Sequence, residues 1–146
     1  MENQSPPHVI KQQIIKEYAL RFSIKIFIET GTYQGDMVTA MENVFKKIYS
    51  IELDRELYKK ATQKFSKKKH IEILNGDSSD ILPGILENIH EPVLFWLDGH
   101  YSGGITAKGL LETPIMNELS TVFSHTESDY HVVLIDDARC FTGESD

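Results

Sequence analysis

Five short apolar segments recur along the chain, separated by segments in which apolar residues follow a helical spacing. They lie at 24–29, 47–52, 71–74, 93–98 and 131–136. All are rich in Ile, Val, Phe and Tyr, and two are nearly continuous, as strands buried on both faces of a parallel sheet are. We therefore predict five β-strands at these positions.

The segments between the strands place apolar residues three and four positions apart, as amphipathic helices do. Leu57, Ala61 and Phe65 are one example, and a further helix is expected at about 9–20, before the first strand. Asp54 is a predicted N-cap, and Ser78 or Ser79 is predicted to cap the helix that follows the third strand.

Strict alternation of strand and helix predicts an α/β fold. We expect a Rossmann-like, doubly wound and mostly parallel sheet of five strands, with helices on both faces. A single domain spanning 1–146, with its core at 24–137, accounts for the whole pattern.

Composition narrows the class of protein. A formal net charge of −7 argues against a nucleic-acid or anionic-membrane surface, because neutralising phosphates requires clustered Lys and Arg. The single cysteine, Cys140, excludes an intrachain disulfide, and no apolar run approaches the ~18 residues of a membrane span. The polar N-terminus has no signal-peptide pattern, so we expect a soluble, cytoplasmic protein.

Acidic residues stand at the end of every predicted strand or just beyond it. Any one of them is most often a turn residue or a helix cap, but five strands out of five favour a shared role. In an open parallel sheet these ends lie along one edge, where ligands bind. The acids are Glu29, Glu52, Asp77, Asp98 and the pair Asp136–Asp137.

The turn after the first strand, "ETGTYQGD", adds to this pattern. Gly31 permits a tight turn, and Gly35 lets the next helix begin close to the sheet. Glu52 follows Gly31 by 21 positions, where an acid binds the ribose hydroxyls of an adenosine ligand. Tyr33 stands where a dinucleotide site needs a glycine, and the turn has no Lys or Arg for a phosphate. An acid-lined cleft instead suits a cationic ligand without phosphate, such as S-adenosylmethionine.

The motifs "FIETGTYQGD", "YSIELD", "LNGDSSDIL", "FWLDGH" and "VVLIDD" together resemble those of class I S-adenosylmethionine-dependent methyltransferases. This resemblance implies the strand order 3-2-1-4-5. The last two resemble the metal-dependent macrocin O-methyltransferases, and animal catechol O-methyltransferases have a comparable arrangement. The resemblance implies that Glu29, Gly31 and Tyr33, in the turn that ends at Gly35, contact the methionine part of the cofactor. It further implies that Glu52 binds the ribose and Asp77 with Ser78 the adenine edge.

The resemblance also implies a divalent cation on Asp98, Asp136 and Asp137. Three neighbouring carboxylates raise one another's pKa unless a cation compensates, and oxygen ligands without cysteine or paired histidine favour Mg²⁺ or Ca²⁺. The alternative is that Asp137 only caps a turn while Asp136 lines the cofactor pocket.

The catalytic base is less well marked. The macrocin group has an acid where this chain has His100, which is therefore a general base, a metal ligand or a plain loop residue. Tyr101 replaces the lysine of the catechol enzymes. Lys108 lies in the glycine-rich "HYSGGITAKG", which is interpreted as a mobile lid or a substrate loop. Asp98, His100 and Lys108 stay open as candidates, while Trp96 is expected in the core.

The leading prediction is a metal-assisted O-methyltransferase that acts on a hydroxyl of a small molecule, such as a sugar or natural product. A non-catalytic or truncated S-adenosylmethionine-binding module is the alternative, and a nucleotide-dependent oxidoreductase is disfavoured. Class I methyltransferases normally add two strands after the fifth, yet this chain ends nine residues after Asp137. We therefore expect either a fragment or a homo-oligomer formed through the edge of the fifth strand.

Overall fold

The computed structural model describes residues 5–98 and 114–138, and the predicted alternation of strands and helices is confirmed there. Helix α1 precedes the sheet, and η1 is a single 3-10 turn before the last strand. In chain order the elements are α1 His8–Arg21, β1 Ile26–Thr30, α2 Asp36–Met41, β2 Lys47–Glu52, α3 Arg55–Lys64, β3 Ile71–Asn75, α4 Ser78–Leu86, β4 Val93–Asp98, α5 Pro114–Ser124, η1 Ser128–Tyr130 and β5 Val132–Asp136.

The five strands form one parallel sheet in the order β3-β2-β1-β4-β5, as predicted. β1 pairs with both β2 and β4, so the strand order reverses beside it. In doubly wound sheets the crevice at this reversal is the usual ligand site. The register places Asp98 of β4 opposite Asp136 of β5, so the two acids end neighbouring strands.

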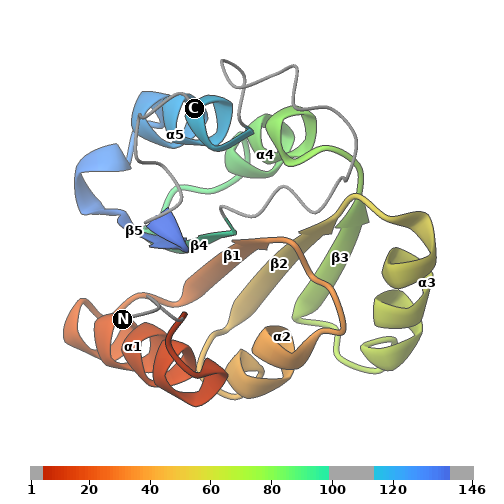
Figure 1. The fold of residues 1–146 in the computed structure, drawn as a ribbon. Coiled ribbons are helices and arrows are strands. Elements are labelled where there is room, and N and C mark those ends of the chain that lie inside the picture. Colours follow the sequence, from red (N-terminus) through yellow and green to blue (C-terminus); the bar gives the residue numbers. More distant parts are fainter. Residues whose placement is uncertain (1–4, 99–113, 139–146) are drawn as a thin grey trace, which may run out of the picture.

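Helices cover both faces of the sheet (Figure 1). α1 and α2 bury Ile15, Ala19 and Met41 against one face, in a core cluster that also holds Phe27 of β1 and Phe65 after α3. On the other face α4 and α5 pack against the sheet through a second cluster, which includes Leu82, Ile85, Ile115 and Val122. Both faces of β1 and β4 are therefore buried, which explains why these strands read as nearly continuous apolar runs.

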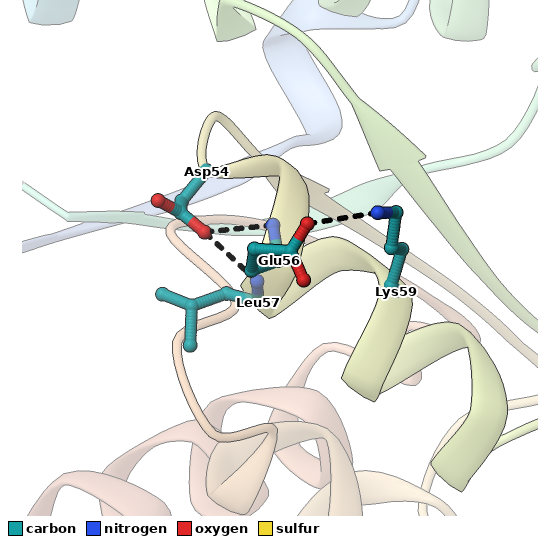
Figure 2. A network of polar contacts seen from close by, with 4 residues as sticks. All are labelled: Asp54, Glu56, Leu57 and Lys59. Atoms are coloured by element: carbon teal, nitrogen blue, oxygen red, sulfur yellow. Dashed lines mark hydrogen bonds and ion pairs between the residues drawn. The ribbon is translucent and has the colours of Figure 1, made fainter.

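Two helix starts place acidic residues beside the strand ends. Asp54 caps α3, as predicted, because its Oδ1 accepts the backbone N–H of Glu56 and Leu57 at 2.9 Å each, and Lys59 pairs with Glu56 at 2.8 Å (Figure 2). The cap of α4 is Asp77, whose Oδ1 accepts the N–H of Ser79 at 2.8 Å. The prediction of Ser78 or Ser79 as this cap was wrong, because both serines already lie within the helix.

A pair of stacked histidines joins strands β4 and β5 to the end of α4. The Val93 N–H donates to Nδ1 of His131 at 3.1 Å, so in the neutral ring the proton sits on Nε2, 2.9 Å from Nδ1 of His125. His125 then donates from Nε2 to the carbonyls of Leu86 and Ile89. Burial, together with His125, lowers the pKa of His131 to about 4, which keeps this ring neutral.

No helix among residues 5–98 and 114–138 combines the length and the apolar character that crossing a membrane requires.

Candidate functional site

The carboxyl ends of the strands border a pocket of about 190 Å³. Its walls come from α1, the turn after β1, the start of α2, and the ends of β4 and β5. The lining residues are His8, Lys11, Glu29, Gly31, Thr32, Tyr33, Gln34, Asp36, Met37, Trp96, Asp98 and Asp136.

The lining of the pocket includes five of the predicted site residues, which come from β1, the turn after it, β4 and β5: Glu29, Gly31, Tyr33, Asp98 and Asp136. Gly35, Glu52, Asp77, Ser78 and Asp137 are not part of its lining. His100 and Lys108 lie outside the described residues.

The turn after β1 depends on positive backbone angles. Gly31 has φ +86°, and its N–H donates to the Ile51 carbonyl at 2.8 Å. A Cβ at this position would lie 3.0 Å from Oδ2 of Asp98, so only glycine lets β4 bring that carboxylate so near the turn. Tyr33 also has positive φ, +49°, a strained conformation that is typical of functional turns.

Gly35 begins α2 at φ +78°, and a Cβ there would lie 2.9 Å from the Phe65 ring. The sequence predicted that Gly35 lets α2 begin close to the sheet, whereas the close neighbour in the structure is the aromatic ring that follows α3. A contact of Gly35 with the cofactor stays a prediction.

Glu29 is the most deeply buried acid of the pocket, with 1% of its surface exposed. Oε1 accepts a hydrogen bond from Ser50 at 2.6 Å, and Ser50 lies 2.6 Å from the Thr32 hydroxyl. Burial raises the pKa of Glu29 to about 8; the Ser50 bond opposes this shift, and the charges of Asp98 and Glu52 add to it. A cationic group placed beside Glu29 would restore its ionised form.

Glu52 holds two loops together at the end of β2. Its Oε2 accepts the Tyr33 N–H and its Oε1 accepts the Asp54 N–H, each at 2.8 Å. Each carboxylate oxygen has a second lone pair, so the predicted contact with ribose hydroxyls is still chemically open. That contact stays a prediction.

Ser78, predicted to bind the adenine edge, donates its hydroxyl to Oε1 of Glu118 on α5. Glu118 is buried, and burial raises its pKa although the Ser78 bond opposes this. Sequence reasoning missed Glu118; the available signal was a charged residue between Ile115, Leu119 and Val122 on an apolar helix face. Asp77 is engaged as the cap of α4, so the adenine contact of both residues stays a prediction.

Asp98 and Asp136 end neighbouring strands, and a lysine from helix α1 binds the carboxylate of Asp136. Nζ of Lys11 lies 2.7 Å from Oδ1 and 2.8 Å from Oδ2 of Asp136. Asp98 donates its backbone N–H to the Thr30 hydroxyl at 3.1 Å, and Asp137 has φ +51° in the turn after β5. Sequence reasoning missed Lys11, which lines the pocket. Trp96, expected in the core, packs against the core cluster and also lines the pocket.

The predicted cation site can be compared with this geometry. Within residues 5–98 and 114–138, no three His, Cys, Asp or Glu side chains are grouped so that they could hold a metal ion. Mg²⁺ and Ca²⁺ need six or more oxygen ligands, and both oxygens of Asp136 already face an ammonium group. The described residues therefore do not fit a divalent cation as they stand, and Mg²⁺ stays a prediction of the resemblance.

Comparisons with known proteins find solved structures with a similar fold. No protein-family sequence model and no curated protein matches the chain. A caffeoyl-CoA O-methyltransferase-like protein of Staphylococcus aureus superposes with a TM-score of 0.63 at 12% identity, over 87% of this chain and 56% of that one. The S-adenosylhomocysteine-bound methyltransferase PaMTH1 of Podospora anserina gives 0.60 at 13% identity, over 87% and 52%.

An rRNA methylase of Streptococcus thermophilus is also similar, with a TM-score of 0.56 at 13% identity over 96% of this chain and 76% of that one. The chain thus spans little more than half of the first two proteins. At such low identities the likeness concerns the fold, which agrees with the observed strand order and helix layers. The chain has the Rossmann-like fold of the class I S-adenosylmethionine-dependent methyltransferases.

Proposed function

We propose that this protein is an S-adenosylmethionine-dependent O-methyltransferase that acts on a hydroxyl of a small molecule. One observation carries the proposal: a buried carboxyl, Glu29, faces a pocket beside a glycine turn at the point where the strand order reverses. Such a site favours a ligand with positive charge, and S-adenosylmethionine carries a sulfonium and an ammonium group.

The proposed contacts follow the order of the strands. Glu29, Gly31 and Tyr33 hold the methionine part in the pocket, with Gly35 shaping the same turn. Glu52 binds the ribose, and Asp77 with Ser78 faces the adenine edge. Asp98 lies between the cofactor and the acceptor, because it lines the pocket and lies against the Gly31 turn.

In the proposed reaction the acceptor oxygen attacks the methyl carbon along the axis of the carbon–sulfur bond. An oxygen–carbon bond forms, the carbon–sulfur bond breaks, and its electron pair returns to sulfur, which becomes neutral. The hydroxyl proton passes to a base, for which Asp98, His100 and Lys108 are the candidates. Holding the two reactants in line is the main contribution of the pocket. Metal assistance is not used in any of these steps.

The class of acceptor is a proposal as well. One similar structure is an rRNA methylase, but a net charge of −7 disfavours a polyanionic acceptor. A hydroxylated small molecule without phosphate avoids this repulsion. The alternative is a binding module that holds the cofactor without transferring its methyl group. A cytoplasmic location stays a prediction.

Cofactor binding is tested by thermal unfolding and calorimetry. S-adenosylhomocysteine at about 100 times its Kd is expected to stabilise the protein by about 2.7 kcal/mol, and NAD is expected to have no effect. Glu52→Ala is expected to lose this stabilisation, because it removes the acceptor of the Tyr33 and Asp54 N–H groups. The matched control Glu56→Ala removes an exposed carboxylate bound only to Lys59 among the described residues and should keep it.

Stabilisation by NAD alone would contradict the proposal. Formation of S-adenosylhomocysteine from S-adenosylmethionine, in the presence of a panel of sugars and phenols, distinguishes an enzyme from a binding module.

We also propose that two copies associate through the edge of β5. Among the described strands β5 pairs only with β4, so its outer backbone groups face away from the sheet. Unpaired strand edges readily accept another strand. Light scattering is expected to show a dimer whose proportion rises with concentration, and a monomer over the full concentration range would contradict this proposal.

A further inference from the structure

We propose that Lys11 is the resident cation of the acidic ends of β4 and β5 and occupies the place that the resemblance to metal-dependent O-methyltransferases assigns to a divalent metal. The ammonium group contacts both oxygens of Asp136, the register neighbour of Asp98. Helix α1 therefore contributes a functional group to the pocket besides covering the sheet.

The sequence of α1 fixes the direction of this side chain. Lys11, Ile15 and Ala19 follow one another at intervals of four, so they lie on one stripe of the helix. Ile15 and Ala19 are buried in the core cluster beneath the sheet. Their burial turns the stripe toward the sheet and leaves Lys11, one turn earlier, at the strand ends.

The pair differs from the other ion pairs of the described residues. The side chains of Lys11 and Asp136 are 13% and 16% exposed, whereas those of Lys46 and Glu91 are 55% and 50% exposed. Exposed pairs contribute little, and a pair withdrawn from water loses hydration that only good geometry offsets. Two contacts of 2.7 and 2.8 Å supply that geometry.

The charges of the residues that line the pocket also support Lys11 as its cation. Four of its lining residues are acidic, namely Glu29, Asp36, Asp98 and Asp136, and Lys11 is the one lysine or arginine among the described residues that line it. A divalent cation that used Asp136 would have to displace this ammonium group.

A consequence for the acceptor rests on the proposed function. An ammonium group has three N–H donors, and its two contacts with Asp136 leave a donor for a further oxygen. Lys11 thereby acts as a positioning residue that holds the acceptor oxygen near the cofactor, a task that the metal performs in metal-dependent enzymes.

The inference is tested by thermal unfolding of the whole chain in increasing MgCl₂ or MnCl₂, with ionic strength held constant by NaCl. The wild-type protein is expected to show no saturable stabilisation. Lys11→Met is expected to gain one, with a Tm rise of about 4 °C or more at saturation, because Asp136 then loses its ammonium partner and both of its oxygens become available to a metal ion. Asp136→Asn added to Lys11→Met should remove the gain.

Lys46→Met is the matched control, since it breaks an exposed lysine–carboxylate pair remote from the pocket residues and should not respond to the metal. Saturable stabilisation of the wild type that Asp136→Asn abolishes would overturn the inference, and so would a folded Lys11→Met protein that does not respond. If Lys11→Met does not fold, the wild-type titration alone decides. Binding of S-adenosylhomocysteine, measured separately by calorimetry, shows whether the proposed function fails independently.

Discussion

Gly31→Ala is expected to weaken binding of S-adenosylhomocysteine by at least about tenfold and to destabilise the protein, by roughly 1–2 kcal/mol from the backbone alone. The first cause is the φ of +86°, which an L-residue adopts only with strain. The second is space, since the new Cβ would lie 3.0 Å from Oδ2 and 3.3 Å from Cβ of Asp98. Relief of this clash moves either the turn or the end of β4, and both border the pocket.

Gly84→Ala provides the matched control. Gly84 lies within α4, and a Cβ there meets no atom within 4 Å. Alanine is a better helix former, so this variant should be neutral or more stable by up to about 1 kcal/mol. Urea unfolding and calorimetry on both variants measure the two effects. If Gly31→Ala and Gly84→Ala had the same stability and the same affinity for S-adenosylhomocysteine, the turn after β1 would not depend on glycine.

The strands and the helical layers could be predicted because each rests on a local pattern, and the strand order was predicted from the resemblance to class I methyltransferases. Alternating short apolar runs and helical stripes repeat within about 15 residues, and doubly wound topology then has few alternatives. The acids at the strand ends also follow from this topology, since parallel strands bring their carboxyl ends to one edge. Asp98 and Asp136 were predicted to be neighbours on this basis, and the register confirms it.

The partners of those acids could not be predicted, because they come from distant positions through side-chain geometry. Lys11 and Asp136 are 125 positions apart, and Ser78 and Glu118 are 40 apart. The sequence alone does not distinguish Lys11 from the other lysines. Its place near Asp136 depends on how α1 packs its buried residues against the sheet. The prediction of a metal site was based on three acids, Asp98, Asp136 and Asp137. It did not include Lys11, which the fold places beside Asp136.

Binding of the cofactor is also expected to depend on pH, because the pKa of Glu29 is raised. The sequence marked its position, but its titration depends on burial that only the fold supplies. In the folded protein its pKa is raised from 4.5 to about 8, first of all by burial, so near pH 7 the carboxyl is mainly protonated. A bound ammonium or sulfonium group stabilises the ionised form, so binding must release a proton.

We therefore expect the affinity for S-adenosylmethionine to rise with pH between about 6 and 8, by at most about tenfold per pH unit. Glu29→Gln keeps the shape of the side chain without the carboxyl, so its affinity should be weaker and lack this rise. Because the cofactor's own amino group also titrates, the ratio of the two affinities, measured by calorimetry at each pH, isolates Glu29. A ratio that stays constant from pH 6 to 8 would show that no cation of the ligand lies beside this carboxyl.

Without cofactor, Glu29 is expected to make the free energy of unfolding fall as the pH rises, which is the opposite direction to the change in cofactor affinity. The unfolded chain loses this proton near pH 4.5 and the folded chain near pH 8, so between these values the folded state binds more protons. The free energy of unfolding contributed by Glu29 is therefore largest below pH 4.5 and falls as the pH rises, by up to about 1.4 kcal/mol per pH unit. Urea unfolding of the wild type should show this decline, and Glu29→Gln should flatten it. A loss of stability in the free protein over the range where cofactor affinity increases identifies Glu29 as a carboxyl that the fold holds neutral until a cationic ligand arrives.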